Sequence, residues 1–198
     1  MRQPLPEALR LYLVTDQASL RGRTLADVVL AAVQGGVSCV QLREKTQATR
    51  DFVELAIAVK KLLAPFAVPL VINDRIDVAL ACHADGVHLG QSDMPVAMAR
   101  QLLPPGVFIG LSVENLDDVT RAASQPVDYL GISPVYATPT KTDTAAPWGL
   151  AGVRQVRALS RLPLVAIGGI HHGNAAEVLQ AGADGLAVVS AVCSAPDP

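Results

Sequence analysis

Residues 41–45, Gln-Leu-Arg-Glu-Lys, place an amide, a guanidinium and an ammonium group at the end of an apolar run. In an extended strand alternate side chains point to the same side, so we expect Gln41, Arg43 and Lys45 to project together. Arginine binds a phosphate through two parallel hydrogen bonds, and lysine adds a positive charge. The spacing therefore predicts an anion-binding cluster, and the alternative is a solvated loop at a strand end.

Two acidic side chains follow later apolar runs. Asp74 comes directly after Asn73 at the end of residues 69–74, and Asp93 comes just beyond residues 86–91. Mg²⁺ takes oxygen ligands and is often held by one or two carboxylates together with substrate phosphates. Taken alone, Asp74 fits a turn and Asp93 fits a helix N-cap equally well. Near a basic cluster, the pair predicts a Mg²⁺–diphosphate site.

Hydroxyl groups and another lysine follow the fifth and sixth runs. Ser112 ends residues 108–112 and could donate to a phosphate oxygen or cap the next segment. Thr138, Thr140 and Lys141 lie within four positions, which suits recognition of a phosphate and a leaving group. The alternative is a polar loop without a site. A loop of residues 137–146 that closes over the substrates is compatible with both interpretations.

Two turns near the C-terminus have a composition typical of phosphate sites. Gly168 and Gly169 end the run 163–169, and Val189 and Ser190 end the run 185–190. Glycine allows backbone N–H groups to approach an anion closely. In eight-stranded α/β barrels the loops after strands seven and eight frequently bind a phosphate.

The histidines and cysteines do not indicate a zinc site or a catalytic dyad. His83, His88, His171 and His172 lack zinc-ligand spacing, and none has an evident partner for acid–base catalysis. The cysteines at 39, 82 and 193 lack such spacing too. They are interpreted as structural, reduced thiols of a cytoplasmic protein.

Eight short apolar runs alternate with stretches of helical spacing, and this order positions the polar residues. Such runs are typical of parallel strands buried on both faces, and eight βα units can close a barrel whose active site lies at the C-terminal strand ends. We therefore predict a single domain, residues 1–198, with the (β/α)8 TIM barrel fold. Its eighth outer helix is expected to be short or missing. The apolar runs span residues 11–16, 38–44, 69–74, 86–91, 108–112, 129–133, 163–169 and 185–190.

Composition excludes several classes of function. The chain has 198 residues and a formal net charge of −2, which gives no basic footprint for nucleic acid or for an anionic membrane surface. It has no apolar run of about 20 residues and no secretory signal in residues 1–10. We expect a cytoplasmic protein that acts on small molecules, and a homo-oligomer is left open.

Taken together, the motifs resemble those of the thiamine-phosphate synthase family, in the same order and from about Leu11 to the end of the chain. A match to seven motifs in order is far more specific than any one of them. The matching segments are residues 41–45, 73–75, 86–91 with Asp93, 110–112, 138–141, 167–170 and 189–191.

The resemblance implies a TIM barrel that joins hydroxymethylpyrimidine diphosphate to hydroxyethyl-methylthiazole phosphate and releases pyrophosphate. It implies that Asp74 and Asp93 bind Mg²⁺, and that Ser112 and Lys141 contact the pyrimidine substrate or the departing pyrophosphate. The implied catalytic set is Arg43, Lys45, Ser112 and Lys141. The remaining implied contacts are Gln41, Arg43, Lys45 and Asn73 to the pyrimidine diphosphate, and Thr138, Thr140, Gly169, Val189 and Ser190 to the thiazole phosphate.

The chemistry of these substrates favours a dissociative reaction, because an electron-rich aminopyrimidine can stabilise the cation left by diphosphate. Cationic groups and Mg²⁺ would neutralise charge on the leaving group, and no covalent nucleophile is needed. Two alternatives stay open. A thiazole tautomerase on the same barrel would need no diphosphate site and could use Glu114, and a non-catalytic sensor of thiamine phosphate could dispense with the metal carboxylates.

Overall fold

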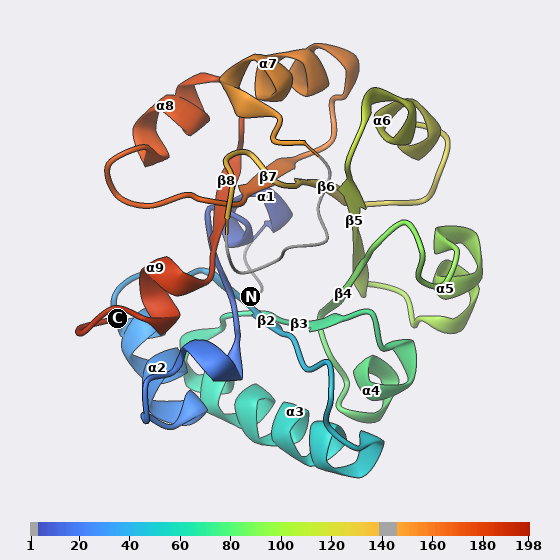
Figure 1. Ribbon diagram of the computed structural model, residues 1–198. Helices are drawn as coiled ribbons and strands as arrows, with labels where there is room; N and C mark the ends of the chain where they lie inside the picture. The colour runs from blue at the N-terminus through green and yellow to red at the C-terminus, as the bar shows by residue number, and fades with distance from the viewer. Residues whose placement is uncertain (1–3, 139–145) are drawn as a thin grey trace.

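Eight parallel strands form a closed barrel in the computed structural model, which describes residues 4–138 and 146–198 (Figure 1). The strands are β1 (Leu11–Val14), β2 (Cys39–Leu42), β3 (Leu70–Asn73), β4 (Gly86–Leu89), β5 (Phe108–Val113), β6 (Tyr129–Ile132), β7 (Leu164–Ile167) and β8 (Gly185–Val188). Each strand pairs with its neighbours in sequence, and β8 pairs with β1 to close the ring. The predicted (β/α)8 TIM barrel is confirmed.

A ring of helices surrounds the barrel (Figure 1). These are α2 (Leu25–Gln34), α3 (Thr49–Leu63), α4 (Ile76–Ala81), α5 (Val96–Leu102), α6 (Leu116–Ala122), α7 (Gly149–Leu159), α8 (Ala175–Gln180) and α9 (Ser190–Cys193). The Thr24 hydroxyl accepts the backbone N–H of Asp27 at 3.1 Å where α2 begins. Asn115 accepts the N–H of Asp118 at 2.9 Å where α6 begins. Both side chains satisfy donors that a first helical turn leaves unpaired.

The core has two layers, because alternate side chains of each strand point towards the helices or towards the barrel axis. The outer layer is aliphatic and fills the space between strands and helices. The cysteines are free and buried, in keeping with the structural role predicted for them. The inner layer contains Leu9, Tyr12, Val14, Cys39, Val71, Tyr129, Val165 and Ala187.

Glycines in the strands make room for the large side chains of the inner layer. A Cβ on Gly110 would lie 2.1 Å from the Tyr129 ring, and a Cβ on Gly131 would lie 2.8 Å from the His88 ring. Real Cβ atoms do not approach so closely. The positions of Tyr129 and His88 therefore depend on glycine at these two points.

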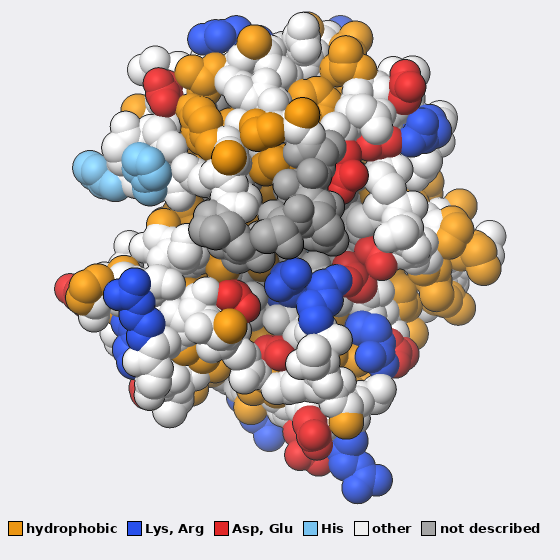
Figure 2. Space-filling model, in the orientation of Figure 1, with side chains coloured by type: hydrophobic (Ala, Val, Ile, Leu, Met, Phe, Trp, Pro, Cys, Tyr) orange, Lys and Arg blue, Asp and Glu red, His pale blue; other side chains and the backbone are white. Residues whose placement is uncertain are grey.

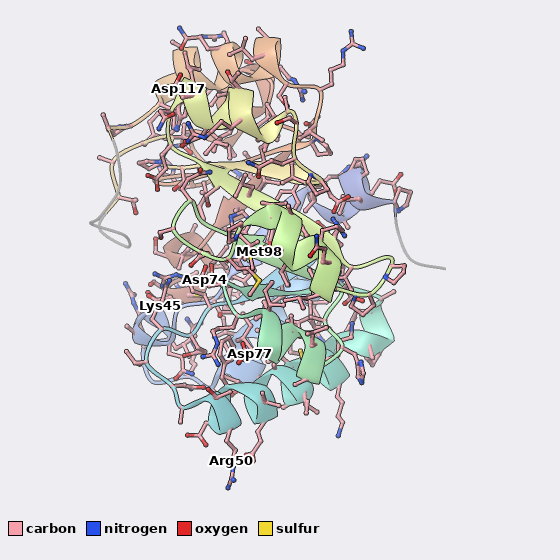
Figure 3. The ribbon with its side chains drawn as sticks, turned by 90° about the vertical axis from the view of Figure 1, so that its right-hand side faces the viewer. Lys45, Arg50, Asp74, Asp77, Met98 and Asp117 are labelled. Atoms are coloured by element: carbon pink, nitrogen blue, oxygen red, sulfur yellow. The ribbon has the colours of Figure 1, made fainter. Side chains whose placement is uncertain are left out.

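The short helix α1 (Leu5–Ala8) lies at the barrel end at which the strands begin. Leu9 follows this helix and is fully buried in the inner layer. Figure 3 shows α1 on the side of the barrel opposite Lys45 and Asp74. The polar strand-end residues therefore gather at the other, C-terminal end.

The final helix is a single turn, so the prediction of a short eighth outer helix is confirmed. The Arg23 guanidinium donates to the Cys193 carbonyl at 2.7 Å, and the Ser194 hydroxyl donates to the Ser19 carbonyl at 3.3 Å. These bonds hold α9 against the connection between β1 and α2. Within the described ranges, none of the helices has both the length and the apolar character needed to cross a membrane.

Candidate active site

A cavity of about 780 Å³ opens at the C-terminal ends of the strands. Near the centre of this face, Lys and Arg side chains gather close to Asp and Glu side chains (Figure 2). The cavity brings together every predicted site residue that the structure describes, whereas Thr140 and Lys141 lie outside the described residues. The residues brought together are Gln41, Arg43, Lys45, Asn73, Asp74, Asp93, Ser112, Thr138, Gly169, Val189 and Ser190.

Lys45 and Asp74 form an ion pair at one side of the cavity, and Figure 3 shows the two residues close together. The Lys45 ammonium lies 2.6 Å from the Asp74 carboxylate, and the side chains are 52% and 23% exposed. Asp74 follows the end of β3 with φ of 62°, and its N–H donates to the His88 carbonyl at 2.9 Å. The main chain thus turns sharply to direct this carboxylate into the cavity.

Asp93 lies next to Asp74 although the two come from different loops. Its carboxylate accepts the N–H of Gly90 at 2.6 Å. Partial burial, together with the neighbouring Asp74 carboxylate, raises the pKa of Asp93 above its usual value. Two carboxylates that disfavour each other's charge form a site that a divalent cation would stabilise.

The described residues supply two carboxylates at this point but no cluster of three or more His, Cys, Asp or Glu side chains arranged for a metal. Such a site is too sparse for a structural zinc ion. It fits Mg²⁺, which keeps several waters and completes its coordination with substrate phosphates.

Arg43 lies just beyond β2, which is shorter than predicted. Its backbone N–H donates to the Thr15 hydroxyl at 3.1 Å, and its side chain lines the cavity with Lys45. Gln41 remains inside β2 and is 4% exposed. The three side chains expected to project together therefore differ in position. The Gln41 amide is buried, whereas Arg43 and Lys45 lie at the mouth of the cavity.

The turn after β7 has the backbone geometry that its two glycines predict. Gly168 and Gly169 have φ of 105° and 63°, in the left-handed region that favours glycine. A Cβ on Gly169 would lie 2.7 Å from the Tyr136 Cβ. The Asn174 amide donates to the Gly169 carbonyl at 2.9 Å and its oxygen accepts the N–H of His171 at 2.8 Å, which fixes the turn.

A family model described as thiamine monophosphate synthase matches residues 11–192. The chain belongs to this family. It is 74% identical over 192 residues to the thiamine-phosphate synthase of Albidiferax ferrireducens, covering 97% of this chain and 88% of that protein. It is 54% identical to the Vibrio campbellii thiamine-phosphate synthase, covering 96% and 93%.

One solved structure agrees with this assignment, and a second shares the fold. The thiamine phosphate pyrophosphorylase from Pyrococcus furiosus matches with a TM-score of 0.90 and 38% identity, covering 98% of this chain and 92% of that chain. The N-acetylmannosamine-6-phosphate 2-epimerase from Clostridium perfringens matches with a TM-score of 0.70 at 13% identity, covering 97% and 92%, which shows the fold alone. Membership of the thiamine monophosphate synthase family makes the chain an enzyme, and the resemblance read from its motifs is confirmed.

Three side chains that line the cavity of this thiamine monophosphate synthase family member are not among the predicted site residues: Tyr12, Tyr129 and His88. None of the three lies beyond the C-terminal end of a strand: Tyr12 and His88 are inside β1 and β4, and Tyr129 is the first residue of β6. Two signals could have found them. The alternation of β1 points Tyr12 to the same side as Val14, and glycines at 110 and 131 leave space beside strands that carry large side chains.

Proposed function

We propose that the chain joins 4-amino-5-hydroxymethyl-2-methylpyrimidine diphosphate to hydroxyethyl-methylthiazole phosphate, with thiamine phosphate and pyrophosphate as products. The observation that carries this proposal is the grouping of Lys45, Asp74 and Asp93 at the mouth of one cavity, which a left-handed glycine turn also lines. The first feature suits a metal-bound diphosphate, and the second suits a phosphate monoester. Family membership supports the same pair of substrates.

Asp74 and Asp93 would hold Mg²⁺, whose bound charge would lower the energy of the departing diphosphate. Partial burial, together with the proximity of the Asp74 carboxylate, raises the pKa of Asp93 and supports this role. Lys45 already pairs with Asp74, so it is placed to contact an anion bound beside that carboxylate. Arg43, Gln41 and Asn73 would complete the pyrimidine diphosphate site.

Ser112 and Lys141 would contact the pyrimidine substrate or the departing pyrophosphate. Ser112 lies within β5 and its side chain lines the cavity. The thiazole phosphate would lie against the two turns after β7 and β8, where backbone N–H groups replace charged side chains. The residues assigned to this phosphate are Thr138, Thr140, Gly169, Val189 and Ser190.

We propose a dissociative reaction in this cavity. The bond between the pyrimidine methylene carbon and the diphosphate oxygen breaks first, and the thiazole nitrogen then adds to the pyrimidine cation. Arg43 and Lys45 neutralise the charge that grows on the leaving diphosphate, which is a larger effect in a water-poor cavity than in bulk solvent. We further propose that the enzyme acts on free small molecules in the cytoplasm.

The test is an assay of the purified protein with both substrates, with Mg²⁺ and after removal of divalent ions by a chelator. We expect thiamine phosphate and pyrophosphate in equal amounts, and only when Mg²⁺ is present. Isomerisation of the thiazole phosphate without pyrophosphate release would support a tautomerase instead. Tight binding of thiamine phosphate without turnover would support a sensor.

A further inference from the structure

A continuous series of hydrogen bonds crosses the inside of the barrel from β2 to β5. The Gln41 amide nitrogen donates to the Tyr12 hydroxyl at 2.9 Å, and the Tyr12 hydroxyl lies 2.9 Å from the Tyr129 hydroxyl. The Tyr129 hydroxyl lies 2.8 Å from His88 Nδ1, and His88 Nε2 lies 2.9 Å from the Ser112 hydroxyl. We call these five side chains the relay.

All five side chains line the cavity, and the relay runs from its buried floor to a more exposed serine. Tyr12 and Tyr129 are 1% and 0% exposed, and Gln41 is 4% exposed. Burial raises the pKa of both tyrosines well above the usual value, so each keeps its single hydroxyl hydrogen. Ser112 is only partly buried and lines the cavity.

Counting hydrogens gives the relay a direction. The Tyr12 oxygen accepts from Gln41, so the Tyr12 hydrogen is left for the Tyr129 oxygen. The Tyr129 hydrogen is then directed to His88 Nδ1; in a neutral imidazole this makes Nδ1 the acceptor and puts the ring hydrogen on Nε2. His88 Nε2–H donates to the Ser112 oxygen, and the Ser112 hydrogen is directed elsewhere.

One competing acceptor lies near the start of the relay. The Cys39 thiol is close enough to the Tyr12 hydroxyl to interact with it. Sulfur is a weak acceptor, so the Tyr129 oxygen is the better partner for the Tyr12 hydrogen. The direction set by Gln41 is therefore retained.

We propose that the relay turns the Ser112 hydroxyl hydrogen into the cavity, towards the oxygen that departs with the diphosphate. The destination of that hydrogen rests on the proposed function, whereas the direction of the relay does not. Tyr12, Tyr129 and His88 are positioning residues in this proposal, since they act on the substrate only through Ser112.

This direction fits a dissociative reaction. Negative charge grows on the departing oxygen as the carbon–oxygen bond breaks, so a hydrogen bond donated there strengthens in the transition state. If the relay ran in the opposite direction, the Ser112 hydrogen would point to His88. Only the Ser112 oxygen would then face the cavity. The direction thus decides whether Ser112 assists the leaving group.

The tautomer of His88 reports the direction without any assay of activity. The chain has four histidines, so selective ¹⁵N labelling yields few resonances, and a His88→Gln variant identifies those of His88. We expect the hydrogen on Nε2 and an unprotonated Nδ1 in the unliganded protein at neutral pH. A hydrogen on Nδ1 would overturn the proposal.

Removal of one hydroxyl tests whether the relay acts through Ser112. Tyr129→Phe keeps the ring in its glycine-lined space but breaks the relay on both sides. We expect a loss of about tenfold in kcat, with the KM for the pyrimidine substrate little changed, and loss of the fixed His88 tautomer. Tyr136→Phe is the matched control, because the Tyr136 hydroxyl donates to Glu177 at 2.9 Å on the surface. It should leave both readouts unchanged.

A double variant separates positioning from a structural effect. If Tyr129 acts through Ser112, then Tyr129→Phe should cost little further kcat in a Ser112→Ala background. Independent, multiplying losses would overturn the positioning role. If His88 carries its hydrogen on Nε2 but the wild-type protein makes no thiamine phosphate, the proposed function fails while the direction of the relay is supported.

Discussion

The two halves of the cavity would bind phosphate by different means. On the side of β2 to β4, the groups are charged side chains: Arg43, Lys45, Asp74 and Asp93. On the side of β7 and β8, they are uncharged: backbone groups of the turn at Gly168 and Gly169, together with the Ser190 hydroxyl. The proposed reaction accounts for this difference, because the diphosphate gains charge as it leaves whereas the thiazole phosphate keeps its charge throughout.

This contrast separates binding from catalysis. Charged side chains that stabilise a growing charge act more strongly in the transition state, so their loss should lower kcat. Backbone groups that hold an unchanging phosphate bind the ground state and the transition state equally, so their loss should raise KM.

The largest effect is expected for Asp74→Asn, which removes a carboxylate from the proposed metal site and the partner of Lys45. We expect kcat/KM to fall by about 10²–10³-fold, mainly through kcat, and to recover in part at high Mg²⁺ concentration. Steady-state kinetics over a range of Mg²⁺ concentrations provide the measurement. Asp117→Asn, in the outer ring of helices (Figure 3), is the matched control and should retain full activity.

Gly169→Ala is expected to have a smaller effect, and to change KM rather than kcat. The added Cβ at φ of 63° would meet the Tyr136 Cβ at 2.7 Å. The KM for the thiazole phosphate should rise about tenfold with kcat retained, and the free energy of unfolding should fall by about 1–3 kcal/mol.

Gly149→Ala is the control for that variant, since Gly149 has φ of 58° and no atom within 4 Å of an added Cβ. Its backbone penalty of about 1–2 kcal/mol should appear in denaturant unfolding without any change in KM. An equal rise in KM for both variants would show that thiazole phosphate binding responds to backbone strain in general. It would not then depend on the close contact between the Gly169 turn and Tyr136.

The fold and the charged half of the site could be predicted because strand-end residues are visible in sequence. Arg43, Asp74 and Asp93 each lie at or just beyond the end of an apolar run. Parallel strands bring all their C-terminal ends to the same face of the barrel. The relay was not predictable in this way. Tyr12 and Tyr129 are separated by 117 positions, and their contact depends on barrel closure and on the space left by Gly110.

The histidine spacing was misleading for a related reason. His88 looked unpartnered in the sequence, because its partners Tyr129 and Ser112 come from β6 and β5. Only the register of the barrel brings them together. The contributions predicted for Thr140 and Lys141 stay predictions, as these residues lie outside the described ranges.

The smallest expected effect is on the pH dependence of folding stability, through the ionisation of Asp93. Its pKa is raised in the folded protein, so the metal-free protein should lose stability as pH rises from the usual aspartate pKa of about 4 through the raised value. Stabilisation by Mg²⁺ should grow over the same window, since the ion requires the charged carboxylate. Thermal unfolding of the wild type and of Asp93→Asn, with and without Mg²⁺, gives the comparison. Identical pH dependence in both proteins would exclude Asp93 as the titrating group.

The most direct test of the division between the two halves is a calorimetric titration of the wild-type enzyme with inorganic pyrophosphate, with Mg²⁺ and with a chelator. We predict binding at least about tenfold tighter with Mg²⁺, retained in Gly169→Ala and lost in Asp74→Asn. Equal pyrophosphate affinity in the presence and absence of Mg²⁺ would contradict a metal–diphosphate site at Asp74 and Asp93.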